Sequence, residues 1–223
     1  LYETGYRFGT EERARIYLTN ALEPWQRQLK LPELDALAHE AAAVNEIKRQ
    51  KRFTVVIGNP PYSNFGQLNR IPFISGILED YKQGLDERKI NLDDDYIKFV
   101  RFSQHLLDNT GLGVFGMITN NSFFDGVTHR QMRHSLGQSF QRISILNLHG
   151  SANLGETGPD GSAEENVFDI RQGVGVTLCV KRGSQNQGPF KLEHADLWGR
   201  REVKYGALEE MLVGHSSFRE LPH

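Results

Sequence analysis

The sequence predicts an α/β protein with a mostly parallel sheet and an antiparallel hairpin at the edge of that sheet. Between residues 31 and 148, short apolar β-rich runs alternate with helical segments, an order typical of parallel sheets. Two further apolar runs, at 167–170 and 173–180, lie close enough together to form the hairpin. The 223 residues are 38% hydrophobic and 24% charged, as in ordinary globular domains.

The first half of the chain supplies two strands and two helical regions. Residues 13–18 alternate charged and apolar side chains, which predicts a short strand. Residues 31–48 are rich in Ala, Leu and Glu at helical spacing and predict a helix. The apolar run 53–57 is bounded by a glycine and two prolines and is typical of a strand buried on both faces of a parallel sheet. In residues 64–89 the apolar side chains recur at no regular spacing. We predict an ordered excursion of the chain outside the sheet, with one short helix.

The second half continues the alternation more clearly. Residues 93–107 predict an amphipathic helix that begins with three aspartates, where the helix dipole favours negative charge, and ends at a glycine. A strand at 114–119, a helix at 130–140 and a strand at 143–148 follow. Residues 150–165 are rich in Gly, Asp, Glu and Ser, and predict a loop before the hairpin.

A change in composition predicts a domain boundary after Gly183. The next residues read Ser-Gln-Asn-Gln-Gly-Pro, and the tail beyond them is mixed in character. We therefore assign residues 1–183 to one domain, and residues 184–223 to a linker and the start of a following region.

The residues that point to chemistry are Asn59, Pro60, Pro61 and Tyr62. They follow the predicted strand 53–57 directly and so lie at its carboxyl end, where ligands bind in open α/β sheets. The Asn59 side-chain carbonyl and the Pro60 backbone carbonyl could each accept one N–H of an exocyclic amine. That arrangement holds the nitrogen toward a tetrahedral shape and frees its lone pair for attack on a sulfonium methyl group. Tyr62 offers a flat face for stacking on a flipped base.

This strand and motif resemble those of the adenine-N6 DNA methyltransferases in which the cofactor motif precedes the catalytic motif. The resemblance extends from near the N-terminus to Lys181. It is most similar to the methyltransferase part of large single-polypeptide restriction-modification enzymes, through the segments 159–162, 165–170 and 196–200. It implies a Rossmann-like methyltransferase fold, with S-adenosylmethionine as methyl donor and an adenine flipped out of double-stranded DNA as acceptor.

The resemblance implies two further site assignments. Phe168 matches an aromatic residue that packs on the flipped adenine opposite the tyrosine; a core phenylalanine is the alternative. Asn20, Ala21 and Leu22 match the loop that contacts the adenine ring of S-adenosylmethionine. Asn59 is assigned to the cofactor-binding site as well. A helix cap or turn is the alternative for Asn20.

One part of the family pattern is absent. We find no glycine-rich turn, and no acidic ribose-binding residue after it, before Asn59. The string Gly111-x-Gly113-x-x-Gly116 resembles a dinucleotide fingerprint, but it precedes a predicted strand where the fingerprint must follow one. We interpret the first, cofactor-binding strands as lying before Leu1. This segment alone is then expected to bind S-adenosylmethionine weakly and to transfer no methyl groups.

Charge and cysteine content restrict the remaining partners. A net charge of −2 and a pI of about 6.5 exclude a dedicated basic DNA clamp, so most phosphate and sequence contacts are expected from neighbouring segments. The single cysteine, Cys179, forms no internal disulfide, and we predict no metal site. Without an apolar stretch of membrane-spanning length, we expect a cytoplasmic protein with no membrane partner. Covalently linked or associated restriction-modification domains are further expected partners.

Two alternatives remain open from the residues. The same amine-holding chemistry would serve a methyltransferase that acts on RNA or on a protein glutamine. The missing cofactor motif also leaves open a non-catalytic module of the same fold that binds DNA or a partner subunit.

Overall fold

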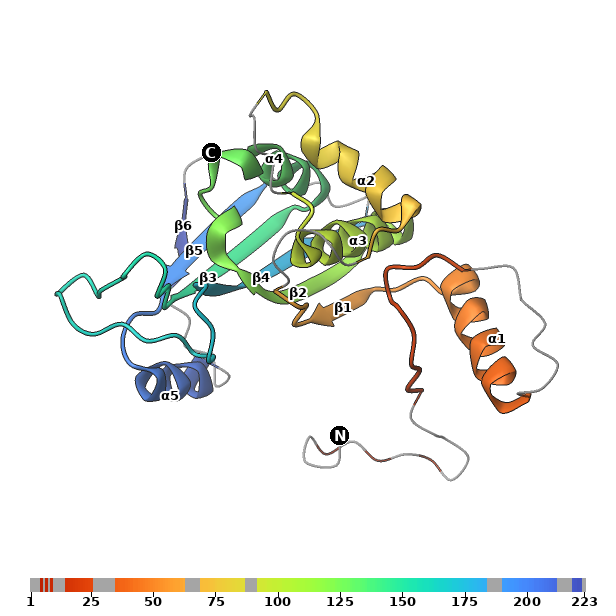
Figure 1. Ribbon diagram of the computed structural model, residues 1–223, viewed down its shortest axis with the longest axis horizontal. Helices are drawn as coiled ribbons and strands as arrows, with labels where there is room; N and C mark the ends of the chain where they lie inside the picture. Colours follow the sequence, from red (N-terminus) through yellow and green to blue (C-terminus); the bar gives the residue numbers. More distant parts are fainter. Residues whose placement is uncertain are drawn as a thin grey trace. The chain divides into compact units, whose positions relative to one another are not determined.

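The computed structural model describes residues 5, 7, 9, 15–25, 35–62, 69–86, 92–183, 190–211 and 218–221. The chain divides into two compact units, Leu1–Lys51 and Arg52–His223 (Figure 1).

The first unit contains the helix α1, Asp35–Gln50. It confirms the predicted helix at 31–48 over the described residues and runs two residues further. The predicted strand at 13–18 is wrong over its described part, because residues 15–18 adopt no regular structure. Ile16 and Leu18 are 81% and 97% exposed. Alternation alone cannot make a strand, since strand residues need a hydrogen-bonding neighbour.

The second unit is built on one six-stranded sheet with the order β1-β2-β4-β3-β5-β6. β1 pairs with β2, and β3 with β5, in parallel, whereas β4 and β6 pair antiparallel to their neighbours. Four strands therefore point the same way, which agrees with the predicted mostly parallel, Rossmann-like α/β fold. The strands are β1 Val55–Gly58, β2 Gly113–Asn120, β3 Arg142–His149, β4 Val174–Lys181, β5 Lys191–Asp196 and β6 Arg219–Glu220.

The predicted edge hairpin is wrong. Residues 167–170 form bends and no strand, and β4 lies inside the sheet between β2 and β3. β4 pairs with β2 in continuous register from Asn120 opposite Val174 to Gly113 opposite Lys181, and it also pairs with β3. Both edges of β4 are thus occupied by the longest strands of the sheet, which leaves no edge for a hairpin partner.

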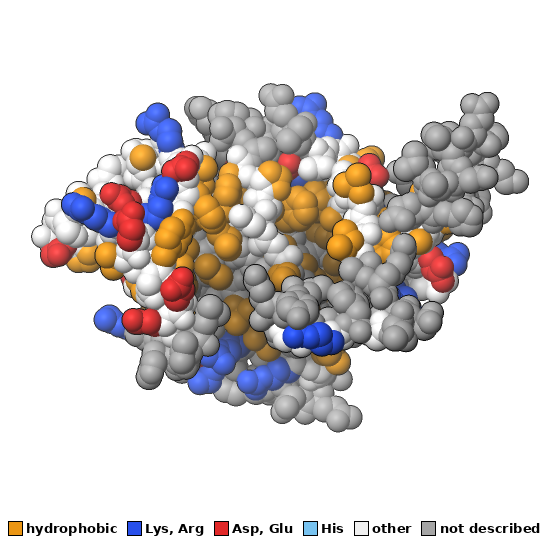
Figure 2. Space-filling view, turned by 90° about the horizontal axis from the view of Figure 1, so that it is seen from below, with side chains coloured by type: hydrophobic (Ala, Val, Ile, Leu, Met, Phe, Trp, Pro, Cys, Tyr) orange, Lys and Arg blue, Asp and Glu red, His pale blue; other side chains and the backbone are white. Residues whose placement is uncertain are grey.

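The predicted burial of β1 on both faces is also wrong. Val55 is 63% exposed and Ile57 is 81% exposed. Among the strands that the structure describes, β1 stands at the end of the sheet order, with β2 as its one neighbour. The register places Val55, Ile57 and Leu178 on the same face, and Leu178 is 42% exposed. In the view from below, apolar side chains gather over the middle of the surface (Figure 2).

Helices cover the sheet from two sides (Figure 1). Three lie on one side: α2 Pro72–Lys82, α3 Asp95–Thr110 and α4 Arg130–Ser139. They confirm the short helix expected in the excursion and the two later predicted helices. α3 ends at Gly111 with a φ of 83°, a left-handed cap that glycine adopts readily. On the other side lies α5, Arg201–Met211.

The tail beyond Gly183 continues the same sheet. β5 pairs with β3 over its whole length, from Arg142 opposite Lys191 to Asn147 opposite Asp196. The boundary predicted after Gly183 therefore separates neighbouring strands of one sheet. The assignment of 184–223 to the start of a following region stays a prediction.

The core fills the space between the sheet and α2–α4. Phe115 and Phe140 meet edge to face with ring centroids 5.2 Å apart, and Cys179 is fully buried opposite Phe115 in the β2–β4 register. Cys179 is therefore a small buried residue of this core. No helix in the described part of the chain is long and apolar enough to cross a membrane.

Candidate active site

The predicted catalytic residues lie at the carboxyl edge of the sheet. Asn59 and Pro60 follow β1 directly, with Asn59 exposed and Pro60 buried. β1, β2 and β3 point the same way, so the segments after these strands reach the same edge as the segment that enters β4. That edge is where open α/β sheets bind ligands, as the sequence predicted.

Tyr62 orients the Asn59 side chain. The Tyr62 hydroxyl donates a hydrogen bond to Asn59 Oδ1 at 3.1 Å. Burial raises the pKa of Tyr62 to about 12, so the hydroxyl keeps its proton at neutral pH. A carboxamide oxygen has two lone pairs, and one remains to accept an N–H from a ligand. The contact fixes Asn59 without exhausting its accepting capacity.

Tyr62 and Phe168 contact the same apolar cluster, although 105 positions separate them in the sequence. The buried members of this cluster are Leu146, Leu148, Val167, Val174 and Ala195. Both aromatic residues are partly buried against it. The fold therefore brings together the two residues that were assigned to base stacking, and their stacking role stays a prediction.

Asn166 holds the backbone that carries Phe168. Its buried side chain donates to the carbonyl oxygens of Gly150 at 3.0 Å and Gln172 at 2.6 Å, and accepts from the Phe168 amide at 2.9 Å. Gly150 has a φ of 82°, and a Cβ there would come within 2.4 Å of Asn166 Cα. One side chain thus connects the loop after β3 to the loop before β4.

Two asparagines connect the ends of β2 and β3, the strands on either side of β4. Asn121 Nδ2 donates to Asn147 Oδ1 at 3.0 Å, and the Asn121 amide donates to the Gly173 carbonyl at 3.0 Å. Asn120 caps the turn after β2 by accepting from the Ser122 amide at 2.9 Å. β2 therefore ends at Asn120, and the turn follows directly. These contacts fix the ends of β2 and β3 at the carboxyl edge of the sheet.

His149 closes β3 in an unusual conformation. Its φ is 53°, in the left-handed region, and the register shifts between Asn147 and His149. His149 Nε2 lies 2.7 Å from Asp196 Oδ1, and its ring stacks on Trp198 with centroids 3.3 Å apart. The strained residue is therefore held by β5 and by the segment that follows it.

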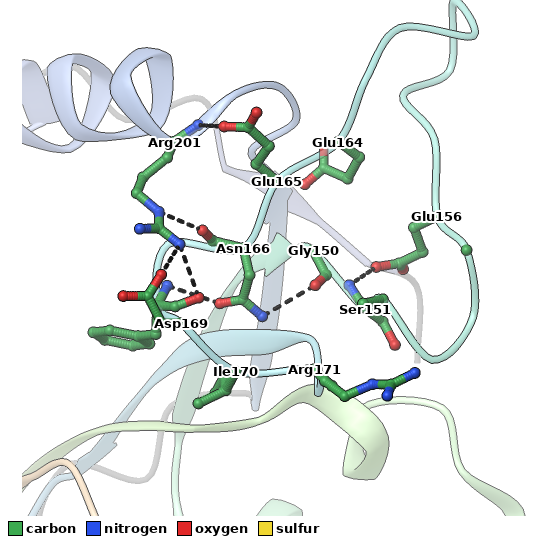
Figure 3. A pocket seen from close by; sticks show the side chains of 13 residues that line it. Gly150, Ser151, Glu156, Glu164, Glu165, Asn166, Asp169, Ile170, Arg171 and Arg201 are labelled. Atoms are coloured by element: carbon green, nitrogen blue, oxygen red, sulfur yellow. Dashed lines mark hydrogen bonds and ion pairs between the residues drawn. The ribbon is translucent and has the colours of Figure 1, made fainter.

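A cavity of about 400 Å³ has Phe168 among its lining residues. Figure 3 shows this cavity from close by, beside Asn166 and Arg201. It lies between the segment after β3 and the segment before β4, with Gly150, Ser151, Asn166, Phe168 and Arg201 among its lining residues. A larger cavity of about 1300 Å³ is lined by residues of β3 and α4, including Asn147, His149 and Leu136. Among the described residues, no group of three or more His, Cys, Asp or Glu side chains could hold a metal ion.

The predicted cofactor loop forms a turn in the first unit. Asn20 Oδ1 accepts from the Leu22 amide at 3.1 Å, and the Asn20 carbonyl accepts from the Glu23 amide at 3.2 Å. Lys48 Nζ donates to the same carbonyl at 2.7 Å. The turn, which was the alternative for Asn20, is present. The assignment of Asn20, Ala21 and Leu22 to S-adenosylmethionine stays a prediction.

The glycine string at 111–116 has a structural role. Gly111 caps α3 and Gly113 begins β2, so the string runs from a helix into a strand. A dinucleotide fingerprint requires the opposite order, and its rejection is confirmed. In the described part of the chain, Gly126 lies between β2 and α4 and Gly199 lies between β5 and α5, and each stands alone, so neither forms a glycine-rich turn.

Sequence reasoning missed the contribution of α5. Arg201, Lys204 and Tyr205 donate hydrogen bonds to the segment that carries Phe168. Their spacing of i, i+3 and i+4 places them on one face of a helix. That spacing was a signal in the tail, but the partners of these side chains lie more than 30 positions earlier in the sequence.

Known proteins share this sequence pattern and fold. The sequence matches the Eco57I restriction-modification methylase family over residues 8–154. The structure is similar to that of the ATP-dependent Type ISP restriction-modification enzyme LlaBIII bound to DNA, with 29% identity and a TM-score of 0.76 over 93% of this chain and 14% of that chain.

Two further structures show the same fold. The DrdV–DNA complex is 24% identical, with a TM-score of 0.68 over 82% of this chain and 18% of that chain. A nuclease-deletion mutant of the Type ISP enzyme LlaGI, in complex with a DNA substrate mimic, is 20% identical, with a TM-score of 0.68 over 83% of this chain and 18% of that chain. The chain thus spans 18% or less of each of these proteins. No curated protein sequence matches it. The match over residues 8–154, about two thirds of the chain, shows that it belongs to the Eco57I restriction-modification methylase family.

Proposed function

We propose that this chain carries the amine-binding part of a DNA methyltransferase that transfers a methyl group from S-adenosylmethionine to N6 of a flipped adenine. One observation carries the proposal: Asn59-Pro60-Pro61-Tyr62 lies at the carboxyl edge of the sheet, with Tyr62 and Phe168 packed on one apolar cluster. The family assignment supports methyl transfer, and the adenine specificity rests on the motif.

The chemistry follows from the accepting groups. Asn59 Oδ1, oriented by Tyr62, takes one N–H of the amine, and the Pro60 carbonyl takes the other. The amine nitrogen would then keep its lone pair out of the ring and could attack a sulfonium methyl carbon, as the bond from that carbon to sulfur breaks and a neutral thioether leaves. Its proton leaves after transfer, so the site needs no strong base before the step. Because its pKa is raised, the Tyr62 hydroxyl stays protonated at neutral pH and donates a hydrogen bond to Asn59.

Asn59 is the residue of this loop that we assign to the cofactor. Asn59 is exposed at the end of β1, so its amide can meet a bound molecule. S-adenosylmethionine, when bound, supplies an electrophilic methyl group on a sulfonium sulfur. Asn20, Ala21 and Leu22 are the residues that we assign to its adenine ring, and Asn59 is the residue that we place nearest its methyl group.

Double-stranded DNA is the proposed substrate. The similar LlaBIII and DrdV structures are complexes with DNA, and the LlaGI structure is a complex with a DNA substrate mimic. This chain spans a small part of those proteins, so we propose that further parts of a restriction-modification enzyme supply most phosphate contacts. The net charge of −2 supports that division, because DNA affinity depends on locally concentrated positive charge.

The test measures transfer of a labelled methyl group from S-adenosylmethionine to unmethylated DNA by the natural full-length protein. Asn59→Ala is compared with Asn109→Ala, a matched amide loss at the exposed end of α3. We expect label in N6-methyladenine from the wild type and from Asn109→Ala, and none from Asn59→Ala. Label found in RNA or in a protein glutamine would show that the substrate is RNA or protein and not DNA. Failure to bind the cofactor would favour a non-catalytic module.

A further inference from the structure

The segment that carries Phe168 is held by side chains of α5 in place of a neighbouring strand. Residues 164–170 form no strand, so their carbonyl groups have no ladder partners. Buried backbone carbonyls need hydrogen-bond donors from elsewhere. Four consecutive carbonyls receive them from three α5 side chains: Glu165 from Lys204 at 2.6 Å, Asn166 from Arg201 at 2.9 Å, Val167 from Tyr205 at 2.7 Å and Phe168 from Arg201 at 3.1 Å.

Lys204 anchors this arrangement to the end of β3. Its side chain is fully buried and ion-paired with the buried carboxylate of Glu164. The same Nζ donates to the Leu148 carbonyl at 2.6 Å. A buried ammonium group is tolerated when its donors are satisfied, and Lys204 has three acceptors. The helix is thereby joined both to the sheet and to the Phe168 segment.

The segment in turn caps the start of α5. Glu165 Oε2 accepts from the Arg201 amide at 3.1 Å, and Glu164 Oε2 accepts from the Gly199 amide at 2.7 Å. Carboxylates at a helix N-terminus satisfy its free amides and complement its dipole. The helix and the segment therefore hold each other from both directions.

Arg201 acts on Phe168 most directly. Its Nη2 donates to the Phe168 carbonyl and also reaches Asp169 Oδ1 at 2.7 Å, while Asn166 Oδ1 accepts the Phe168 amide. Figure 3 shows the Arg201 guanidinium directed at Asn166 and Asp169 from the start of α5. Both backbone polar groups of Phe168 are hydrogen-bonded, which fixes the backbone from which its ring packs on the apolar cluster.

We propose that Arg201 and Lys204 are positioning residues of the methyltransferase site, which set the Phe168 ring relative to Tyr62. The inference rests on the proposed function, because it assumes that these rings stack on the target base. Stacking depends on the placement of the ring, so loosening its backbone slows transfer even when the ring is retained. The helix that follows β5 thus contributes to catalysis without touching the substrate.

The test uses four variants of the natural full-length protein. Arg201→Ala removes the whole guanidinium. Arg201→Lys keeps the charge but loses the planar fork that reaches two carbonyl groups. Asp169→Asn removes the ion pair and leaves both carbonyl bonds, and Asp169 is 92% exposed. Arg200→Ala changes an exposed arginine beside them and is the control.

Two measurements are made on each variant. Amide hydrogen exchange over 165–170 reports the hold of α5 on the segment, independently of activity. Single-turnover methyl transfer, at saturating DNA and S-adenosylmethionine, reports the positioning of the base. Hydrogen bonds to a charged group predict about 10- to 100-fold faster exchange and slower transfer in Arg201→Ala. Arg201→Lys should show most of that loss, whereas Asp169→Asn and Arg200→Ala should stay within about two-fold of wild type.

The outcomes separate the two proposals. Unchanged exchange in Arg201→Ala would overturn the inference whatever the activity. Faster exchange with unchanged transfer would also overturn it, because the hydrogen bonds from α5 would then have a structural role only. Full rescue by Arg201→Lys would show that charge suffices and would overturn the role of the fork. A wild-type protein that binds S-adenosylmethionine but methylates no DNA would overturn the proposed function. Amide hydrogen exchange would still measure how firmly α5 holds the segment 165–170.

Discussion

Replacing Tyr62 separates its two assigned tasks. Tyr62→Phe removes the hydroxyl that donates to Asn59 Oδ1 at 3.1 Å and leaves the ring on the apolar cluster. Tyr62→Ala removes both. If the hydroxyl orients Asn59 and the ring stacks on the base, the two variants must differ in size of effect.

The magnitudes follow from the contacts. A hydrogen bond between neutral groups contributes about 0.5–1.5 kcal/mol, so Tyr62→Phe should slow methyl transfer by about 2- to 12-fold. Base stacking on an aromatic ring contributes about 1–3 kcal/mol, so Tyr62→Ala should be at least about five-fold slower again. The hydroxyl should not titrate in the working range, because the pKa of Tyr62 is about 12.

The assay is single-turnover methylation of a duplex that contains the target site, measured from pH 7 to pH 10. Tyr62→Phe and wild type should show the same pH profile, displaced by a constant factor. Equal rates for Tyr62→Phe and Tyr62→Ala would refute the division into hydroxyl and ring. A fall in the wild-type rate near pH 10 that is absent in Tyr62→Phe would refute the raised pKa.

Three further predictions concern stability and accessibility. Gly150→Ala should lower the thermal unfolding midpoint, since its Cβ would meet the Asn166 backbone at 2.4 Å, whereas Gly76→Ala, with open space in α2, should raise stability by up to ~1 kcal/mol. Burial lowers the pKa of His129 from 6.5 to about 4, so the unfolded chain binds this proton first and stability falls as the pH drops from 6.5 toward 4; His129→Gln should weaken that dependence in thermal denaturation. Burial also raises the pKa of the Cys179 thiol, which should resist alkylation until the protein unfolds, as mapped by mass spectrometry.

The elements found from the sequence are those whose signal is local. The helix predicted at 93–107 and the strands at 114–119 and 143–148 all appear, with bounds that differ by up to three residues. Their apolar residues recur at one period along a long segment and are bounded by glycines or polar turns. Propensity, periodicity and burial agree in these segments, so no tertiary contact overrides them.

The errors arise where a non-local neighbour decides the outcome. The run 167–170 is apolar like a strand, but the carbonyls of Val167 and Phe168 bond to side chains of α5. β1 is apolar like a central strand, but its place at the end of the sheet exposes Val55 and Ile57. A single sequence does not state the order of strands, so neither result follows from composition.

The candidate site divides in the same way. Asn59 and Tyr62 lie three positions apart beside a strand, and that short motif was readable directly. Phe168 was found through family resemblance, because a lone aromatic residue carries no signature of its own. Arg201 and Lys204 were missed, since their meaning depends on carbonyl groups more than 30 positions earlier in the chain.

The separation of chemistry from support has a consequence for substitution at this edge of the sheet. In the proposed reaction, the groups that accept the amine N–H bonds belong to Asn59 and Pro60, so a change there would alter the reaction itself. The hold on Phe168 is shared among three α5 side chains and Asn166, so losing one donor leaves other bonds in place. A shared hold predicts graded losses of rate along α5, in contrast to the abrupt loss expected at Asn59. That contrast distinguishes a helix that positions the site from a residue that performs the chemistry.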